Sequence, residues 1–156
     1  MSGIYFNTKQ YSMAVFSKTG SPVRRYHTPM KITAVLIVDS IERSLEFWVA
    51  RMGFEKTVEV PEGDLLGFVI LVKDGSELML QTLSSVRQDE PKFARPGYTC
   101  LFIEVEDFAE TKTRLEGYPI ELPERLTFYG MREIGVFEPG GHTVIFAAKT
   151  AEAATS

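Results

Sequence analysis

The fold is decided by residues 32–48, which read ITAVLIVDSIERSLEFW. The first seven of these residues are almost all apolar or β-branched, which is the pattern of a buried strand. Asp39 ends the run and Glu42 follows three residues later, the spacing of a helix N-cap and its reciprocal partner. Apolar residues then recur at helical spacing as far as Met52, and Gly53 is placed as a C-terminal glycine cap. The stretch therefore predicts a strand followed by an amphipathic helix.

Three more strands are predicted after this helix. Two of them are joined by Asp74-Gly75, a strong β-hairpin signal. The three predicted strands are Phe54–Val60, Leu65–Lys73 and Glu77–Thr82. The first half of the chain is thus a βαβββ module.

The same order of elements returns about 68 residues later. Residues 99–115 read TCLFIEVEDFAETKTRL, in which Asp107 and Glu110 repeat the cap spacing. Strands are predicted at Ile120–Leu122, Met131–Phe137 and Thr143–Ala148, the last two joined by Pro139-Gly140-Gly141. The polar segment 88–96 contains two prolines and is expected to be a linker. We therefore predict an α+β domain of two βαβββ modules, at about 31–83 and 97–149, whose mixed sheets curl around a shared cavity.

Composition limits the classes of partner. With 156 residues the chain has the size of one domain, and no apolar run approaches the roughly 18 residues of a membrane helix. Its net charge is −4, but residues 1–30 hold four basic residues and no acidic one, so the rest carries −8. An acidic body disfavours nucleic acid and anionic membranes and weakly favours a neutral or cationic small molecule. The single cysteine, Cys100, is expected to be a small buried apolar residue.

The first 29 residues differ from the rest. They are basic and rich in hydroxyl and aromatic side chains, without sustained periodicity. Three interpretations stay open: a transit-like segment, a mis-assigned start before Met30, or an arm that packs on the body or on a partner subunit. We expect a cytoplasmic protein, or an organellar one if the segment is a transit peptide. Residues 150–156 are a tail.

Three stretches resemble one known family, the glyoxalase, bleomycin resistance and dioxygenase (vicinal-oxygen-chelate) superfamily. They are residues 38–48 (VDSIERSLEFW), residues 52–54 (MGF), and residues 129–133 (YGMRE) leading into 138–141 (EPGG). The YGMRE string is similar to the metal-free, bleomycin-binding branch. The likeness covers Met30 to Lys149. It implies the paired-module fold, but this fold hosts several chemistries.

The resemblance also says where metal ligands would lie, and this chain lacks them. One position is seven residues before each capping Asp, where we find Ile32 and Cys100. The others, on the fourth strand of the first half and on the last strand, hold Met79 and Ile145. A catalytic metal needs about three protein ligands, so we expect no metal and no cofactor. Of the two histidines, His142 is predicted to be a turn residue with a solvated or locally bonded ring, and His27 lies in the extension.

The same positions define a candidate ligand site. If they face inward, the alternation of strands turns Ile32, Ala34 and Leu36 inward as well. The candidate ligand-binding residues are Met79, Gln81, Cys100, Phe102, Tyr129, Met131, Arg132 and Ile145. Tyr129 or Met131 could stack on a flat ligand, although Arg132 or Glu133 could instead form an ion pair at a sheet edge. Trp48 is expected in the core.

Three functional hypotheses follow. The first is a metal-free binding protein, a homodimer that sequesters a hydrophobic or aromatic compound, which can be cationic. The second is an enzyme of the same superfamily (a lyase, isomerase or dioxygenase) with displaced or absent metal ligands. Glu104 and Glu133 are its candidate catalytic residues as an acid–base pair. The third is a structural or regulatory partner without a ligand. We expect binding rather than catalysis.

Overall fold

The computed structural model describes residues 15–16, 22–23 and 31–150. Residues 1–32 and 33–156 form two separate compact units. In the first unit β1 (Val15–Phe16) pairs antiparallel with β2 (Pro22–Val23). The three interpretations of residues 1–29, and His27, otherwise lie outside the described residues.

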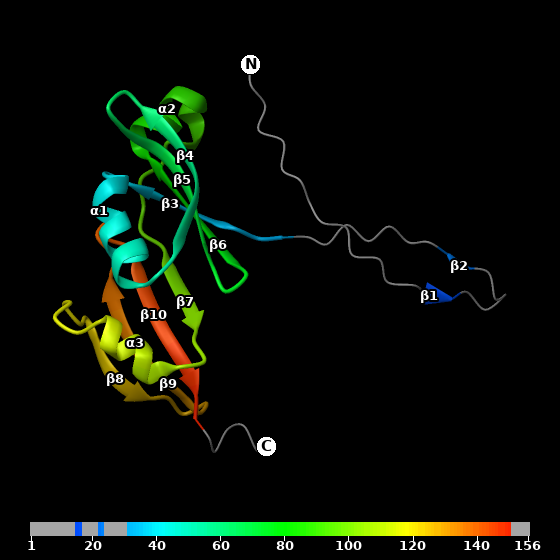
Figure 1. Ribbon diagram of the computed structural model, residues 1–156, viewed down its shortest axis with the longest axis vertical. Helices are drawn as coiled ribbons and strands as arrows, with labels where there is room; N and C mark the ends of the chain where they lie inside the picture. The colour runs from blue at the N-terminus through cyan, green and yellow to red at the C-terminus, as the bar shows by residue number, and fades with distance from the viewer. Residues whose placement is uncertain (1–14, 17–21, 24–30, 151–156) are drawn as a thin grey trace. The chain divides into compact units, whose positions relative to one another are not determined.

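The second unit contains two modules of the same topology (Figure 1). The first consists of β3 (Ala34–Val38), α1 (Ile41–Leu45), the π-helix η1 (Glu46–Arg51), β4 (Glu55–Glu62), β5 (Leu65–Lys73) and β6 (Ser76–Thr82). The second consists of β7 (Cys100–Glu104), α3 (Phe108–Arg114), β8 (Leu122–Leu126), β9 (Met131–Phe137) and β10 (Thr143–Lys149). The sheet orders are β3-β6-β5-β4 and β7-β10-β9-β8, with the first strand of each parallel to its neighbour. The predicted α+β class with two βαβββ modules is confirmed.

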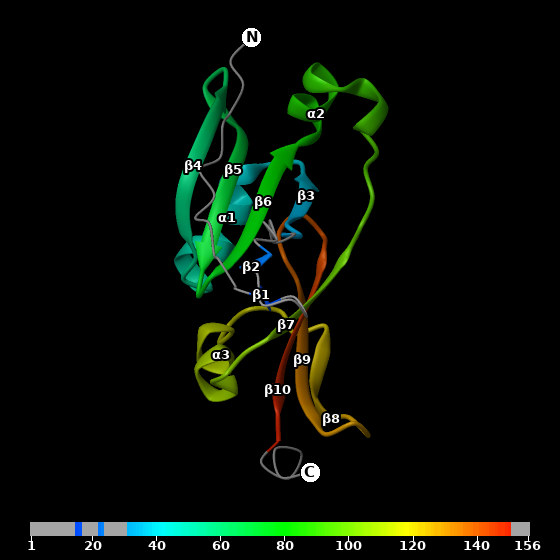
Figure 2. The same cartoon turned by 90° about the vertical axis from the view of Figure 1, so that its right-hand side faces the viewer.

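Each sheet is covered by a helix on one face. Figure 2 shows α1 behind the first sheet, β4 to β6, and α3 beside β7 and β10 of the second sheet. The hydrophobic core lies between helices and sheets and includes Leu36, Phe47 and Phe146. Trp48 is fully buried in this core, as predicted. The sheet face turned away from the helix is termed the open face.

The start of α1 differs from the prediction by one residue. Ser40, not Asp39, is the N-cap, and its Oγ accepts a hydrogen bond from the Arg43 backbone N–H at 3.3 Å. Glu42 does not reach back to the cap N–H; its Oε1 accepts from the Leu66 N–H at 2.8 Å. In α3 the predicted cap is right, because Asp107 Oδ1 accepts from the Glu110 N–H.

The same one-residue shift affects β3. Ala34 and Leu36 lie on the helix side, where Leu36 is fully buried in the core. The prediction that they face inward to a ligand site is therefore wrong, and Val35 and Ile37 occupy the open face instead. A one-residue slip exchanges the two faces of a strand, and an uninterrupted apolar run does not reveal which residues face which way.

The connection between the modules is partly helical. The expected linker at residues 88–96 begins inside α2 (Leu83–Asp89) and continues into a short 3₁₀ turn, η2 (Pro91–Phe93). The Thr82 side chain caps α2 by accepting a hydrogen bond from the Ser85 N–H at 3.1 Å. The polar composition that predicted a linker is here that of an exposed short helix.

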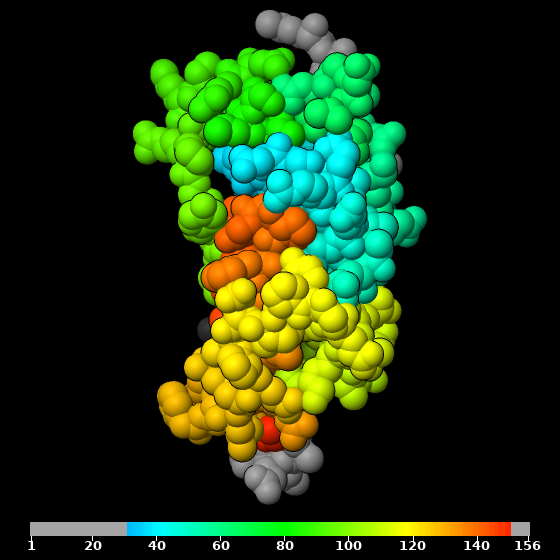
Figure 3. Space-filling model, turned by 90° about the vertical axis from the view of Figure 1, so that its left-hand side faces the viewer, coloured from blue at the N-terminus to red at the C-terminus, as the bar shows by residue number. Residues whose placement is uncertain are grey.

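The turn between β9 and β10 joins the modules. Its Glu138 carboxylate accepts a hydrogen bond from the buried Ser44 hydroxyl of α1 at 3.2 Å. Arg43 donates to the carbonyl of Pro139 at 3.0 Å. Figure 3 shows this segment, in orange, against α1, in cyan. The two modules therefore share a polar, buried contact as well as a hydrophobic core.

His142 completes that contact and is not a solvated turn residue. It is 2% exposed. Its Nδ1 accepts from the Thr99 N–H at 3.1 Å, and its Nε2 lies 3.0 Å from the carbonyl oxygen of Ile37, to which it can donate. The expectation of a solvated or locally bonded ring is therefore wrong, because Ile37 belongs to the other module. The role of His142 is to hold the modules together.

Candidate ligand-binding site

The open face of the first sheet carries the predicted residues Met79 and Gln81. The strand register places Met79 beside Val35 and Gln81 beside Ile37. Val35 is 48% exposed, whereas Met79 and Gln81 are partly buried. Gln81 donates a hydrogen bond to the Ser85 hydroxyl at 3.2 Å. This face is mainly apolar and has one amide group at the end next to α2.

The open face of the second sheet gathers more of the predicted residues. Cys100 pairs with Thr143 and Phe102 with Ile145 across β7 and β10. Phe102 is 49% exposed, and Cys100 is exposed as well. The expectation of a buried Cys100 is wrong, because the strand turns this side chain to the open face rather than toward α3.

Glu133 lies buried on the same face with both of its oxygens bonded. It is 1% exposed, and its Oε2 accepts from Arg125 Nε and Nη2 at 3.0 and 2.9 Å. Its Oε1 accepts a short hydrogen bond from the Tyr129 hydroxyl. The hydrogen bonds from Tyr129 and Arg125 hold the pKa of Glu133 below its usual value. The hydrogen bond to Glu133 also raises the pKa of Tyr129. Glu133 thus fixes an exposed aromatic ring on the open face.

The Tyr129 ring is part of a larger aromatic tip at the β8–β9 turn. Phe128 is fully exposed and meets Tyr129 edge to face, with ring centroids 5.0 Å apart. Tyr129 is 51% exposed and Leu126 is 67% exposed. These rings are available to a ligand or to another protein surface.

Not every predicted residue lies on this face. Arg132 points to the opposite side of β9 from Glu133 and lies 3.4 Å from Glu124, in an ion pair. Met131 lies on the same face of β9 as Glu133 but is only 7% exposed. The ion-pair alternative therefore describes both Arg132 and Glu133.

The suggested acid–base pair of Glu104 and Glu133 is not formed. Both carboxylates sit in one row of the sheet, with Ala147 of β10 between them. Two strand spacings separate the backbones by about 10 Å, and Glu133 is occupied by Arg125 and Tyr129. Neither residue is positioned to exchange a proton with the other.

The metal positions implied by the resemblance do not fit a metal. With Ser40 as the cap, the position seven residues earlier is Thr33, whose hydroxyl donates to Glu77 at 3.1 Å. The remaining positions hold Met79, Cys100 and Ile145. No group of three His, Cys, Asp or Glu side chains within the described residues is placed to hold a metal ion.

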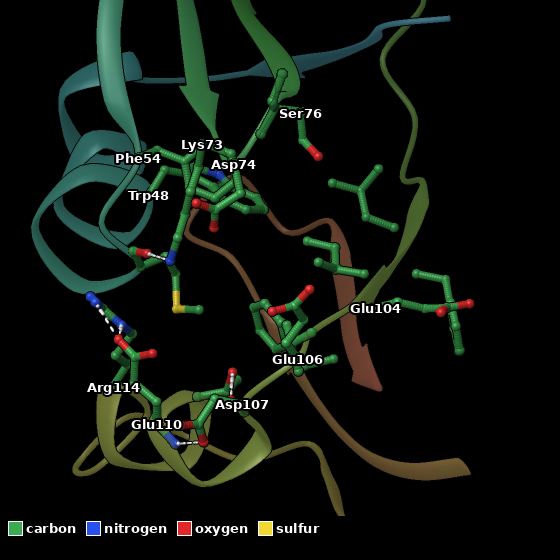
Figure 4. A pocket seen from close by; sticks show the side chains of 18 of the residues that line it. Trp48, Phe54, Lys73, Asp74, Ser76, Glu104, Glu106, Asp107, Glu110 and Arg114 are labelled. Carbon is green, nitrogen blue, oxygen red and sulfur yellow. Dashed lines mark hydrogen bonds and ion pairs between the residues drawn. The ribbon is translucent and has the colours of Figure 1, made fainter. Parts of the chain in front are cut away.

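A cleft of about 960 Å³ lies between the two modules, where a shared cavity was predicted, but most of its lining residues differ from the predicted ones. It opens between the β5–β6 hairpin and the segment from β7 to α3 (Figure 4). Three residues that the sequence predicted to face inward, Ala34, Phe102 and Glu104, are among its lining side chains. The run Glu104-Val105-Glu106-Asp107 was the available signal, since acidic residues cluster there at the end of a strand.

Sequence comparison decides the family. Residues 31–146 match the Glyoxalase/Bleomycin resistance protein/Dioxygenase superfamily. The chain belongs to this superfamily. No curated protein gave a significant match to the sequence. No helix in residues 31–150 or the other described residues is long and apolar enough to cross a membrane.

Solved structures of the superfamily share the fold. TioX from Micromonospora sp. ML1 has a TM-score of 0.63 and 19% identity over 78% of this chain and 100% of its own. A lactoylglutathione lyase from Agrobacterium tumefaciens has a TM-score of 0.62 and 20% identity over 78% and 95%. TnmS3, an antibiotic-binding protein from Streptomyces sp. CB03234, has a TM-score of 0.59 and 15% identity over 79% and 98%. The solved structures that share this fold thus include a lactoylglutathione lyase and an antibiotic-binding protein.

Proposed function

We propose that the chain is a metal-free binding protein that sequesters a hydrophobic or aromatic small molecule between two copies of itself. The observation that supports this most is the apolar surface left uncovered on the open faces of both sheets. Val35, Phe102 and Phe137 are each about half exposed there. Large exposed apolar surfaces in small domains mark binding or association sites.

A second copy would convert open faces into a closed pocket. A two-fold dimer presents the same surface of each copy to the other, so one contact covers both sets of apolar side chains. Ligand pockets are usually concave and mostly apolar, with a few polar groups. In this pocket Phe102, Ile145 and the Tyr129 ring supply apolar area, while Gln81 and Thr143 supply hydrogen bonds.

The binding hypothesis is favoured over the enzyme by the state of the polar groups. Glu133 is the buried carboxylate on the open faces, and its two oxygens accept hydrogen bonds from Arg125 and Tyr129. A general acid or base needs an oxygen within hydrogen-bond reach of the substrate. Glu133 instead orients the Tyr129 ring, which suits stacking on a flat ligand. TnmS3 shows that the fold carries an antibiotic-binding protein.

The test uses metal-free bleomycin as the probe, an aromatic and cationic compound. Calorimetry is performed with the full chain in the presence of a chelator, and sedimentation gives the mass. The proposal expects a dimer that binds the probe, and about tenfold weaker binding by Tyr129→Ala, the loss of one stacking contact. Phe93→Ala, which removes a 72% exposed ring from η2, is the matched control.

Two results would contradict the proposal. A monomer under all conditions would leave the open faces without their second wall. Turnover of a methylglyoxal–glutathione adduct or a catechol, lost in Glu133→Gln or Glu104→Gln, would establish the enzyme instead.

A further inference from the structure

The Tyr129 hydroxyl on the open face has already committed its proton. It donates a hydrogen bond to Glu133 Oε1, and a hydroxyl has a single proton to give. The neighbouring Thr127 hydroxyl donates elsewhere, to the carbonyl of Met131 at 3.0 Å. What the Tyr129 oxygen has left for a ligand is therefore its lone pairs, which can only accept.

Glu133 keeps the direction of this hydrogen bond fixed. A carboxylate can only accept, and an arginine can only donate. Arg125 Nε and Nη2 donate to Glu133 Oε2 at 3.0 and 2.9 Å, which leaves Oε1 to Tyr129. The hydrogen bonds from Tyr129 and Arg125 lower the pKa of Glu133, so the carboxylate is charged at neutral pH. While it is charged, the bond from Tyr129 cannot reverse.

A ligand on the open face can reach Tyr129 but not the charge that holds it. Glu133 is 1% exposed, whereas Tyr129 is half exposed and Phe128 beside it is fully exposed. A flat molecule that packs against these two rings meets the hydroxyl oxygen of Tyr129. Glu133 thus acts on the ligand through Tyr129, as a positioning residue.

Two more polar side chains of the open faces offer acceptors. Gln81 Nε2 donates to the Ser85 hydroxyl at 3.2 Å, and no described residue donates to its Oε1. Glu104 is an exposed carboxylate in the same row of the sheet as Glu133. The polar groups of the first and second sheets therefore favour the same kind of ligand, one that brings donors.

We propose that the open-face site selects flat aromatic ligands that carry a hydrogen-bond donor, an N–H or O–H, and that Glu133 imposes this choice by holding the proton of Tyr129. The inference rests on the proposed function, since it names the chemical class of ligand for the same site. A ligand that brings an acceptor to Tyr129 places lone pairs against lone pairs. An acceptor that loses water and gains no donor costs free energy, so such a ligand binds more weakly.

The test uses three flat probes that differ only in the heteroatoms of one ring: 2-phenylindole, 2-phenylbenzofuran and 2-phenylbenzoxazole. The first carries an N–H donor, the second has neither a donor nor a strong acceptor, and the third has a nitrogen acceptor. Calorimetry with the full chain at neutral pH, with a chelator, gives the three affinities. We expect 2-phenylindole to bind about fivefold more tightly than each of the other two, the effect of one hydrogen bond.

The decisive variant is Glu133→Gln, which should reverse the preference. Because Arg125 can only donate, it faces the oxygen of the new amide, and the amide NH2 then faces Tyr129. This NH2 donates to the Tyr129 oxygen and releases the Tyr129 proton for a ligand. The variant should therefore bind 2-phenylbenzoxazole about threefold more tightly than 2-phenylindole. A merely structural role of Glu133 would weaken the binding of all three probes alike.

Two further variants serve as controls. Tyr129→Phe keeps the ring and removes the oxygen, so the three probes should bind with about equal affinity. Glu121→Gln makes the same chemical change as Glu133→Gln at an exposed position and should keep the wild-type order of affinities.

Failure of this inference is distinct from failure of the proposed function. Equal affinities of the three probes for the wild type, or a wild-type order in Glu133→Gln, would overturn the donor preference and leave binding of flat ligands intact. Tighter wild-type binding of 2-phenylbenzoxazole would show that the exposed end of Arg125 meets the ligand instead, and would overturn it as well. Absence of binding by all three probes would overturn the inference together with the aromatic ligand of the proposed function.

Discussion

The Glu133 carboxylate determines how the Tyr129 ring is held on the open face. Its pKa is lowered in the folded chain by bonds from Tyr129 and Arg125. A group with a lowered folded pKa stabilises the fold above its unfolded pKa, about 4.3 for Glu, and the contribution is lost as pH falls through the folded value. Acid should therefore loosen the Tyr129 ring before it unfolds the core.

The corresponding prediction concerns the pH dependence of stability. Glu133→Gln should lower the free energy of unfolding at neutral pH, and the difference from the wild type should shrink as the pH falls through the lowered pKa of Glu133, because the protonated carboxyl is neutral like the amide. Urea unfolding at several pH values measures it, with the exposed Glu121→Gln as control. A difference that stays constant down to low pH would show that the charge of Glu133 is not what matters.

Gly140 is a residue at which the contact between modules allows no side chain. A Cβ there would lie 2.5 Å from Glu138 Oε1 and 2.6 Å from Val38 Cγ1. Gly140→Ala should destabilise the chain by about 1–3 kcal/mol, the usual cost of overpacking. Gly97→Ala, where a Cβ would have no neighbour within 4 Å, should have little effect. Equal stabilities of the two variants in denaturant unfolding would contradict the close packing of the turn.

At the scale of elements, the N-cap of α1 is Ser40 in the structure, whereas the sequence predicted Asp39. Ser40→Ala should destabilise by about 1 kcal/mol, since it removes the acceptor of the Arg43 N–H. Asp39→Ala should change the free energy of unfolding by less than about 0.5 kcal/mol. Thermal and urea unfolding of the two variants measure both effects. A larger loss of stability in Asp39→Ala than in Ser40→Ala would show that Asp39 is the cap.

Some elements could be predicted to the residue. The bounds of β5 and β9, Leu65–Lys73 and Met131–Phe137, agree with the prediction because turn residues flank each run. The facing of β3 could not be predicted, since Ile32 to Val38 are apolar or β-branched without a polar alternation. The second half was easier. In β7 the position that the resemblance assigns to a ligand, Cys100, set the predicted facing, and the structure has Cys100, Phe102 and Glu104 on one exposed face.

At the scale of the whole molecule, what joins the modules was beyond sequence reasoning. The partners of His142, Thr99 and Ile37, lie 43 and 105 residues away. The cleft is likewise lined by residues of both modules. Such contacts depend on how two folded modules pack, and no local pattern specifies that packing. The fold and a cavity between the modules were therefore predictable, whereas most of the residues that line the cleft were not.

His142 carries the prediction at this scale. His142→Phe keeps a flat ring but leaves the Thr99 N–H and the Ile37 carbonyl without their partner, so it should cost about 1–3 kcal/mol. Because the ring connects both modules, unfolding should remain a single transition with a lower midpoint. Calorimetry of wild type and variant measures this. A midpoint equal to that of the wild type would mean that the modules are held together without His142.

The most direct test of the central claim, ligand binding without a metal, is a thermal-shift screen of the full chain against flat aromatic and cationic compounds, with a chelator and with added divalent ions. A ligand at about 100 times its dissociation constant adds about 2.7 kcal/mol and raises the midpoint by several degrees. We expect at least one organic compound to raise the unfolding midpoint in the presence of the chelator. Stabilisation that appears only with a divalent ion would contradict it.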